Sequence, residues 1–365
     1  MQTIAIVGNS TRGKYGHHLD MAFVGVEGAE IIALADPDEK GRAAIAEKTG
    51  AKTAYADYRE MLEKEKPDIT VFASREIGDH FELVTSAQEI GSGTHIYLEK
   101  PIAATPAEVD QMVAACEAND KLLILATPWR GHPPIQRTAI PLIKDGKIGE
   151  PRLARIHGRN GPHGGNQMFL DLYPHFFDFL EQVWGAPQWC SAHITVEGRD
   201  ATPADLKEGV EGMGLVAGNG IRAYYQFDDF AADFEAYEGD HNQPLPYRVD
   251  IHGTSGTISL PGPMSNQPDI YFHPHVAPEL HSDEHWEVIP SDPPPDDKKW
   301  VNAHHRMAKS MIDRIEGREP EFALLEGSVA RTHVTWAMAA HASHIAGARV
   351  ALPLNTDQNP FENWT

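Results

Sequence analysis

The sequence predicts an α/β protein of two domains: a first domain built on a parallel sheet, and a second α+β domain with a large open, mainly antiparallel sheet. Up to residue 127, short apolar runs alternate with helix-like stretches, whereas several later runs follow one another directly. The length of 365 residues also suits two domains. We place the boundary at Thr127-Pro128, which gives domains over residues 1–127 and 128–365.

The first domain is expected to consist of βαβ units. Continuous apolar runs predict strands that are covered on both faces of a sheet. Strands are expected at residues 3–7, 29–35, 68–73, 94–98 and 121–126, with helices at 38–49, 57–65, 79–90 and 106–119 between them.

The second domain is expected to combine helices with an antiparallel sheet. Helices are predicted at residues 135–145, 169–183, 301–316 and 325–346, and strands at 188–196, 212–217, 221–227, 247–252 and 256–260. Residues 261–299 are rich in Pro, His and Asp and are expected to be a loop. The acidic proline run at residues 292–297 is expected to be solvated, because it lacks apolar residues to bury and cannot hold a regular ladder.

Composition and charge exclude several classes of protein. Asp and Glu number 53 against 31 Lys and Arg, and the net charge of −22 repels nucleic acids and anionic membranes. Cys116 and Cys190 lie far apart without zinc-type spacing, so two buried free thiols are expected. The N-terminus carries no pattern of a secretory leader, and a cytoplasmic protein is expected.

A glycine-containing segment follows the first predicted strand. Gly8 and Gly13 occupy the first and third glycine positions of a dinucleotide-binding turn, whereas Ser10 occupies the second. The segment is expected to open a helix whose N-terminal amides would face an anion. We therefore predict a Rossmann domain in which residues 8–13, including Thr11 and Arg12, contact the cofactor.

Asp36 ends the next predicted strand, 23 residues after Gly13. A carboxylate at this place binds the adenosine ribose hydroxyls and repels a 2′-phosphate, which favours NAD over NADP. Two observations leave alternatives open: Arg12 is able to contact phosphate, and Asp36 is able to act only as a helix cap.

Glu99-Lys100-Pro101 follows the fifth predicted strand. Ligands of open α/β sheets bind at the carboxyl ends of the strands, so Glu99 and Lys100 are expected beside the cofactor. A lysine there would polarise a substrate oxygen or share its proton. The alternative is a surface lysine before a loop proline.

Asp171 and His175 lie four residues apart, which places them on one helix face, with Asp178 close to the same stripe. Histidine exchanges protons near neutral pH, and a carboxylate orients it. Because an interior proline breaks helical hydrogen bonding, Pro174 suggests that the helix begins near Asp171. The alternative, that His175 is an ordinary buried or solvated residue, remains open among 20 histidines.

Together these features resemble the Gfo/Idh/MocA family of oxidoreductases. The resemblance covers roughly residues 1–350 and rests on the glycine segment, Asp36 with Arg42-Ala43, Glu99-Lys100-Pro101 and the Asp171/His175 pair, with further similarity at residues 144–150 and 252–258. It implies hydride transfer between NAD and a secondary hydroxyl of a sugar, glycoside or cyclitol. It also implies a homodimer or homotetramer, because the open sheet of the family commonly mediates oligomers.

The resemblance assigns roles to three residues. Lys100 matches the catalytic lysine of the family, which usually precedes a cis proline, and Asp171 and His175 match its carboxylate and its acid/base. Two departures are Ser10 in place of glycine and Tyr173-Pro174 in place of a small residue before the histidine. For the substrate cleft we expect aromatic and hydrogen-bonding side chains, namely Trp129, Arg130, Asn160, His163 and Tyr173.

Three other functions remain open. One is a redox-neutral glycosidase, lyase or epimerase that oxidises a sugar hydroxyl transiently and holds NAD tightly. Another is a non-catalytic NAD-sensing regulator, against which the joint presence of Lys100, Asp171 and His175 argues. The third is a metal enzyme based on clustered histidines, which we interpret instead as surface or lid sequence: His273, His275, His281 and His285.

Overall fold

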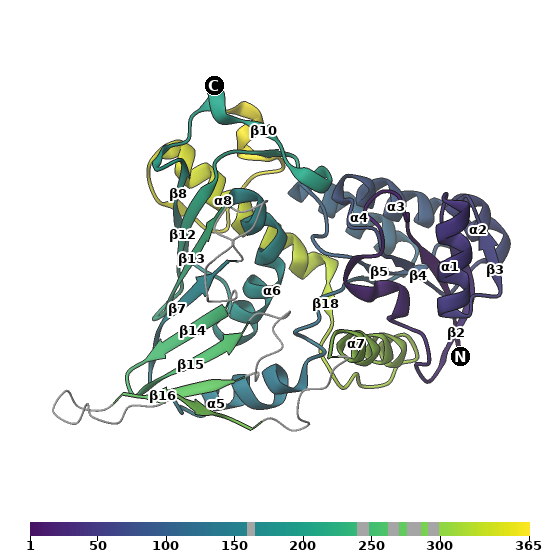
Figure 1. Ribbon diagram of the computed structural model, residues 1–365, viewed down its shortest axis with the longest axis horizontal. Coiled ribbons are helices and arrows are strands. Elements are labelled where there is room, and N and C mark those ends of the chain that lie inside the picture. The colour runs from purple at the N-terminus through teal and green to yellow at the C-terminus, as the bar shows by residue number, and fades with distance from the viewer. Residues whose placement is uncertain (159–164, 239–247, 262–269, 276–285, 291–298) are drawn as a thin grey trace. The chain divides into compact units, whose positions relative to one another are not determined.

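The computed structural model describes residues 1–158, 165–238, 248–261, 270–275, 286–290 and 299–365 (Figure 1). The chain divides into two compact units, neither of which is continuous in sequence. The first comprises Met1–Gly131, Val210–Gly214 and Lys298–Val334, and the second comprises His132–Gly209, Leu215–Asp297 and Thr335–Thr365. From the sequence we expected the second domain to run unbroken from residue 128. The structure differs because late segments of the chain return to the first unit, which local sequence patterns do not reveal.

The first unit is built on a seven-stranded sheet with the order β18-β6-β5-β4-β1-β2-β3. All neighbours pair in parallel except β18, which runs antiparallel to β6. This order of β1 to β6 is that of a doubly wound dinucleotide-binding sheet. The strands are β1 (Gln2–Val7), β2 (Ala29–Ala35), β3 (Thr53–Tyr55), β4 (Ile69–Phe72), β5 (His95–Leu98), β6 (Leu123–Leu125) and β18 (Leu325–Glu326).

Helices with side-chain caps connect these strands. Asp38 and Asp57 cap two of them, and Thr105 forms a capping box with Glu108. Every residue of β4 is buried, as a sheet covered on both faces requires. The connecting helices are α1 (Glu39–Thr49), α2 (Tyr58–Glu65), α3 (Ile77–Glu89) and α4 (Pro106–Ala118) (Figure 1).

The segment after β1 differs from the prediction. Instead of an α-helix it forms a turn closed by a bridge between Asn9 and Lys14, followed by the short 3-10 helix η1 (Gly16–Met21). His17 and His18 interrupt η1 with left-handed backbone angles, at φ 46° and 64°. These angles break the regular helical hydrogen bonding, so an α-helix N-terminus is not available to an anion here.

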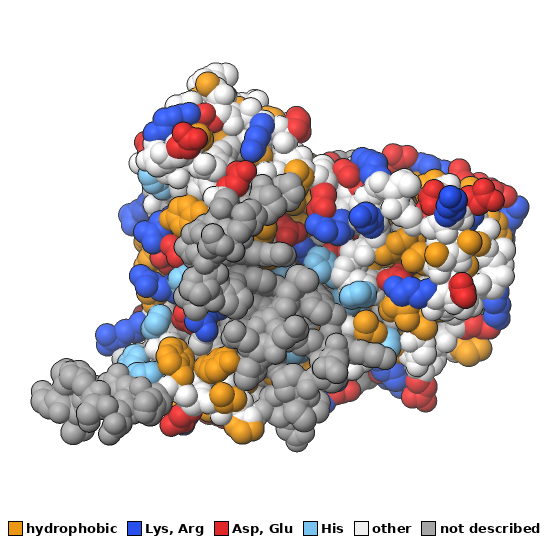
Figure 2. Space-filling view, viewed as in Figure 1, with side chains coloured by type: hydrophobic (Ala, Val, Ile, Leu, Met, Phe, Trp, Pro, Cys, Tyr) orange, Lys and Arg blue, Asp and Glu red, His pale blue; other side chains and the backbone are white. Residues whose placement is uncertain are grey.

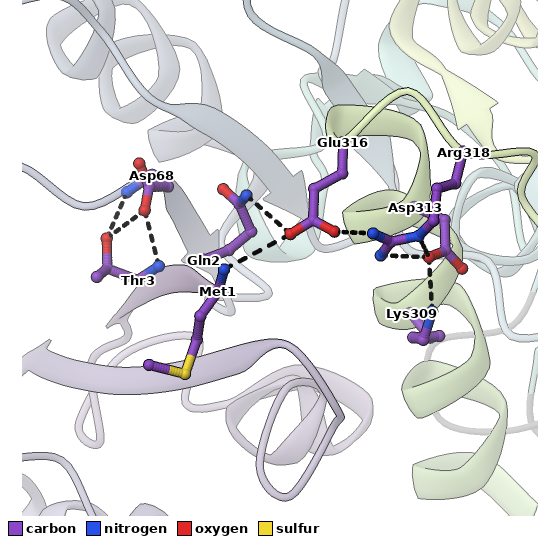
Figure 3. A network of polar contacts seen from close by, with 8 residues as sticks. All are labelled: Met1, Gln2, Thr3, Asp68, Lys309, Asp313, Glu316 and Arg318. Carbon is purple, nitrogen blue, oxygen red and sulfur yellow. Dashed lines mark hydrogen bonds and ion pairs between the residues drawn. The ribbon is translucent and has the colours of Figure 1, made fainter.

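A late segment completes the first unit. Helix α7 (Lys299–Ile315) buries Met307, Met311 and Ile312 in the apolar cluster that contains Ile4. A polar network joins the C-terminal end of α7 and the residues after it to the start of β1 (Figure 3). Ion pairs in which one side chain is exposed, as Arg318 and Met1 are here, contribute at most about 1 kcal/mol each, whereas each buried apolar side chain contributes about 1.5–3 kcal/mol. Apolar burial therefore dominates the attachment of this segment.

The second unit contains a large, mainly antiparallel sheet with the order β17-β16-β15-β14-β7-β13-β12-β8-β19. Strands β7 and β13, which the sequence patterns did not reveal, pair in parallel at its centre. The strands are β7 (Pro151–His157), β8 (Trp189–Val196), β12 (Gly220–Gln226), β13 (Ala231–Tyr237), β14 (Arg248–Gly253), β15 (Gly256–Pro261), β16 (Tyr271–Pro274), β17 (Glu287–Val288) and β19 (Val350–Ala351), with β9 (Arg199–Asp200) beside β8. The predicted fold class is thereby confirmed.

Three expectations for the second unit were wrong in detail. Helix α6 (Asn166–Trp184) begins well before Asp171 and keeps Pro174 inside, because burial of its apolar face outweighs one lost backbone hydrogen bond. The strand expected at residues 212–217 shrinks to β11 (Leu215–Val216), which pairs with β10 (Lys207–Glu208). The segment 261–299, expected to be a loop, contains β16 and β17, whereas the acidic proline run at residues 292–297 lies outside the described residues.

The remaining helices begin or end with local irregularities. A π-helical turn (Pro134–Ala139) leads into α5 (Ile140–Lys144), and α8 (Gly327–Ala346) continues from the first unit into the second. Among the helices of the described residues, none combines the length and apolar character of a membrane span. Basic and acidic side chains intermingle on the visible surface of the first unit, at the right of Figure 2.

Candidate active site

A cavity lies in the first unit where strands β1, β2 and β4 end. It measures about 260 Å³ and is lined by residues that follow these strands and by the start of α2, among them Gly8, Asn9, Ser74 and Tyr58. The guanidinium of Arg59 lies 4.6 Å from the centre of the Tyr58 ring. Ligands of doubly wound sheets bind at the carboxyl ends of the strands, so this cavity is the candidate cofactor site of the unit.

Gly8 and Gly13 have no space for a side chain. A Cβ on Gly8 would lie 2.3 Å from the ring of Tyr15, and a Cβ on Gly13 would lie 2.3 Å from Ser74 Oγ and 2.8 Å from the Glu76 amide nitrogen. Gly13 also has a φ of 69°, which other residues adopt only at a cost. The sequence prediction therefore chose the two glycines that the turn requires for steric reasons.

Asp36 is fully buried beneath this turn. Its Oδ2 accepts hydrogen bonds from the Ser10 amide at 3.0 Å, the Ser10 hydroxyl at 2.6 Å and the Tyr15 hydroxyl at 2.9 Å. Its Oδ1 accepts one from the Asp38 amide at 2.9 Å. Asp36 is thus the internal anchor of residues 8–15, a role that sequence reasoning missed, and its contact with a ribose remains a prediction. The cap of α1 is Asp38 rather than Asp36.

The structure explains why a serine is accommodated at position 10 in place of glycine. Its backbone is outside the left-handed region, so the freedom of glycine is not required at this position. Its side chain occupies space beside Gly41 of α1, where a Cβ would lie 2.0 Å from Ser10 Oγ. The close approach between the turn and α1 therefore requires a glycine at position 41 of α1 and not at position 10 of the turn.

Arg12 and Thr11 make protein contacts at the surface of the turn. Arg12 pairs with Asp79 at 2.6 Å and with Glu76 at 3.2 Å, both near the start of α3. The Thr11 hydroxyl donates to Asn9 Oδ1 at 2.8 Å. The expected contact of Arg12 with a cofactor phosphate remains a prediction, and it competes with these two carboxylates.

Glu99 and Lys100 follow β5 and are both buried, with 0% and 3% of their surface exposed. His17 Nδ1 donates to Glu99 Oε1 at 2.5 Å, whereas Glu99 Oε2 has no hydrogen-bond partner among the described residues. Burial raises the pKa of Glu99, but the charges of His17 and Lys100 and the hydrogen bond from His17 outweigh this effect and hold the pKa below its ordinary value. The carboxylate is therefore ionised beside Lys100 near neutral pH.

The loop after Lys100 is held by a buried histidine that sequence reasoning missed. The Lys100-Pro101 peptide bond is cis, as the family resemblance implied. His80 of α3 lies within hydrogen-bonding distance of the Pro101 carbonyl oxygen, at 3.0 Å, and of the Ser74 carbonyl oxygen, at 2.8 Å. Neither His80 nor His17 stood out in a chain with 20 histidines, because no spacing pattern links them to Glu99 or Lys100.

In the second unit, α6 carries Asp171 and His175 one helical turn apart. His175 is 2% exposed, and Asp178 is fully buried and accepts a hydrogen bond from Gln182 Nε2 at 3.1 Å. Tyr173 is buried, with its ring centre 5.3 Å from that of Phe177, and burial raises the pKa of its hydroxyl. The helix therefore presents the predicted Asp/His pair, while the ring of Tyr173 is part of an aromatic core.

The other expected site residues have different placements. Trp129 and Arg130 are buried in the first unit, where Arg130 donates to the Leu324 carbonyl oxygen at 3.1 Å. Asn160 and His163 lie outside the described residues. Their proposed contacts with substrate remain predictions.

The histidine cluster that suggested a metal site is only partly described. His275 Nε2 lies 3.0 Å from Thr257 Oγ1, and His273 lies in β16. His281 and His285 lie outside the described residues. Within the part of the chain that the structure describes, no three metal-binding side chains converge.

Three features of the first unit fit a dinucleotide. The cavity opens where the strands end, the turn beside it excludes side chains at two glycines, and the buried Oε2 of Glu99 has a vacant acceptor position. Gly8, Gly13 and the start of α2 would border such a cofactor, and Glu99 would accept a hydrogen bond from it.

Comparison with known proteins identifies the first unit. Residues 3–127 match the GFO_IDH_MocA model, described as an oxidoreductase family with an NAD-binding Rossmann fold. D-apiose dehydrogenase of Paraburkholderia graminis is 28% identical over 260 residues, which cover 66% of this chain and 68% of that protein. Myo-inositol 2-dehydrogenase of Thermotoga maritima is 27% identical over 251 residues, which cover 64% and 68%.

Solved structures share the fold over almost the whole chain. A levoglucosan dehydrogenase in complex with NADH and L-sorbose superposes with a TM-score of 0.75 at 17% identity, covering 97% of this chain and 99% of the other. An Agrobacterium radiobacter oxidoreductase in complex with NAD+, L-tartaric acid and magnesium gives 0.70 at 19% identity, covering 96% and 98%. Residues 3–127, the greater part of the first unit, thus match the Gfo/Idh/MocA oxidoreductase family with its NAD-binding Rossmann fold.

Proposed function

We propose that this protein oxidises a secondary hydroxyl of a sugar, glycoside or cyclitol and transfers the hydride to NAD+. The observation that carries the proposal is the buried Glu99-Lys100 pair at the end of β5, in a unit of an NAD-binding oxidoreductase family. The names of the relatives support the substrate class, since they are a D-apiose dehydrogenase and a myo-inositol 2-dehydrogenase.

The chain supplies a base, an orienting group and a cation. His175 removes the proton of the substrate hydroxyl, and Asp171 orients its imidazole. Lys100 stabilises the developing negative charge on the substrate oxygen. When bound, NAD+ supplies the hydride acceptor. Positioning and charge stabilisation account for most of the rate in this mechanism.

The cofactor preference, substrate contacts and assembly complete the proposal. Asp36 disfavours the 2′-phosphate of NADP, and Gly8, Ser10, Thr11, Arg12 and Gly13 border the dinucleotide. Trp129, Arg130, Asn160, His163 and Tyr173 contribute to substrate binding. We further propose a cytoplasmic homodimer or homotetramer that acts on free small molecules.

The test is absorbance of the reduced nicotinamide, with the protein at stoichiometric concentration, NAD+, and a panel of inositols, free sugars, sugar acids and glycosides. We expect sustained NADH formation with at least one compound. Consumption of a compound without net NADH would replace the proposal with the redox-neutral reaction. No reaction with any compound, together with tight NAD binding, would favour the regulator.

A further inference from the structure

His17 and Glu99 form a hydrogen-bonded pair within the first unit. His17 belongs to η1, directly after the glycine turn, and Glu99 follows β5, so two parts of the first unit meet at this hydrogen bond of 2.5 Å. Glu99 is fully buried, whereas the His17 side chain is 17% exposed. A proton on His17 Nδ1 is required, because an ionised carboxylate has none to donate.

The absence of a side chain at Gly16 permits the contact between His17 and Glu99. A Cβ on Gly16 would lie 2.7 Å from Glu99 Cδ and 2.7 Å from Arg75 Cγ, so the backbone of η1 passes directly over the carboxylate. His17 then adopts a left-handed conformation, which points to a constraint at this position.

The titratable groups that act electrostatically on Glu99, or on which Glu99 acts, are His17 of η1, Tyr97 of β5, Lys100 directly after β5 and His304 of α7. His304 Nδ1 lies 2.9 Å from the Tyr97 hydroxyl. Burial lowers the pKa of His304 to about 3, so this imidazole is neutral near pH 7. His17 and Lys100 therefore have the largest effects in lowering the pKa of Glu99.

The environment of Lys100 depends on the ionisation of Glu99, which in turn depends on His17. A buried ammonium requires a counter-charge, and Lys100 is 3% exposed with Glu99 next to it. The Glu99 carboxylate also requires stabilisation, and among the described residues its hydrogen bond comes from His17 alone. Loss of His17 thus weakens the ionisation of the carboxylate beside Lys100 without changing Lys100 itself.

We propose that His17 is a positioning residue that keeps Glu99 ionised and thereby keeps Lys100 oriented for the transfer step. This inference rests on the proposed function for its effect on rate, but its effect on Glu99 is independent of any substrate. It assigns a role to a residue that is not among those lining the cavity where β1, β2 and β4 end.

The decisive variant is His17→Asn. Asparagine tolerates left-handed backbone angles, and its side-chain amide places a neutral donor near the position of Nδ1. The variant therefore removes the titratable imidazole but keeps the backbone conformation and a hydrogen-bond donor. His18→Asn is the matched control, because His18 has a similar backbone conformation and an exposed side chain.

The first readout is infrared spectroscopy of Glu99 in the protein with NAD+ bound. The carbonyl band of its protonated form appears as the pH is lowered, and it is assigned by its loss in Glu99→Gln. Because His17 lowers the pKa of Glu99, we expect the band to appear at higher pH in His17→Asn than in the wild type or His18→Asn. Appearance at the same pH in all three proteins, or in none before unfolding, would overturn the inference.

The second readout is steady-state kinetics on a compound that the wild type oxidises. We expect His17→Asn to lower kcat by about 10- to 100-fold with little change in KM or in the Kd for NAD+. The loss should grow as the pH falls, since more Glu99 is then protonated. An equal loss at every pH, or a loss confined to NAD+ binding, would indicate a purely structural role. If the wild type oxidises nothing, the proposed function fails, and the infrared comparison still decides the role of His17.

Discussion

Tyr15→Phe tests whether Asp36 anchors the glycine turn. The phenyl ring stays in the space that Gly8 leaves open, so the variant removes only the hydroxyl that donates to Asp36 Oδ2 at 2.9 Å. Asp36 is 0% exposed, so water does not replace this donor readily. Burial, with the adjacent Asp36 charge, raises the pKa of Tyr15, which keeps the hydroxyl a donor at neutral pH.

The expected loss is about 1.5–3 kcal/mol, the range for a hydrogen bond to a charged group. For a unit of this size, each kcal/mol lowers Tm by about 2–4 °C, so Tm should fall by about 3–12 °C. Thermal unfolding followed by circular dichroism measures the shift. The control is Tyr55→Phe, whose hydroxyl donates to Glu65 at 2.5 Å with little burial and should have a much smaller effect. Equal Tm values for both variants and the wild type would refute the anchoring role.

Three further predictions concern packing, pH and catalysis. Gly41→Ala should destabilise the protein in urea unfolding, although such a change usually stabilises a helix, because its Cβ would lie 2.0 Å from Ser10 Oγ; Ser10→Gly should restore much of the loss, and absence of rescue would contradict the contact. Burial lowers the pKa of His341 to about 4, below the 6.5 of an exposed histidine, so the unfolded state binds an extra proton between these values. The free energy of unfolding should therefore fall by about 3 kcal/mol as the pH drops from 6.5 to 4, and His341→Gln should show a shallower slope in urea titrations at several pH values. Lys100→Ala should lower kcat by about 100-fold or more while the Kd for NAD+ changes little; parallel losses of both would indicate a structural or cofactor-binding lysine.

The sequence predicted the first unit well because its signals are local. Apolar runs such as Ile4–Val7 are strands in any sheet buried on both faces, and Asp38, Asp57 and Thr105 mark helix starts through their own side chains. The glycines of the turn were also predictable from the sequence, because the steric requirement for glycine applies at each of these positions itself.

Features that depend on contacts between residues far apart in the sequence could not be predicted from the sequence. Pro174 remains inside α6 because packing of the aromatic core overrides a local breaking signal. The return of α7 and β18 to the first unit depends on pairing with elements about 200 residues earlier, such as β6. The same limitation hid His17, since its importance derives from Glu99, 82 positions away.

The candidate site shows a similar division. Gly8, Gly13 and Lys100 were found from spacing and context, and the cis bond before Pro101 agreed with the family resemblance. By contrast, the donors that already occupy Asp36 were unpredictable, because a one-dimensional pattern does not reveal whether a carboxylate faces a ligand or its own chain.

Transfer of deuterium shows whether a hydride passes from a secondary carbinol carbon to the nicotinamide. The panel compounds would be supplied with deuterium on their carbinol carbons, and the nicotinamide of the cofactor would be analysed by mass spectrometry after a single turnover. We predict that one deuterium appears in NADH for at least one sugar or cyclitol, and that Lys100→Ala loses this signal while still binding NAD+. NADH without deuterium, or no labelled cofactor with any compound, would contradict hydride transfer from a secondary hydroxyl.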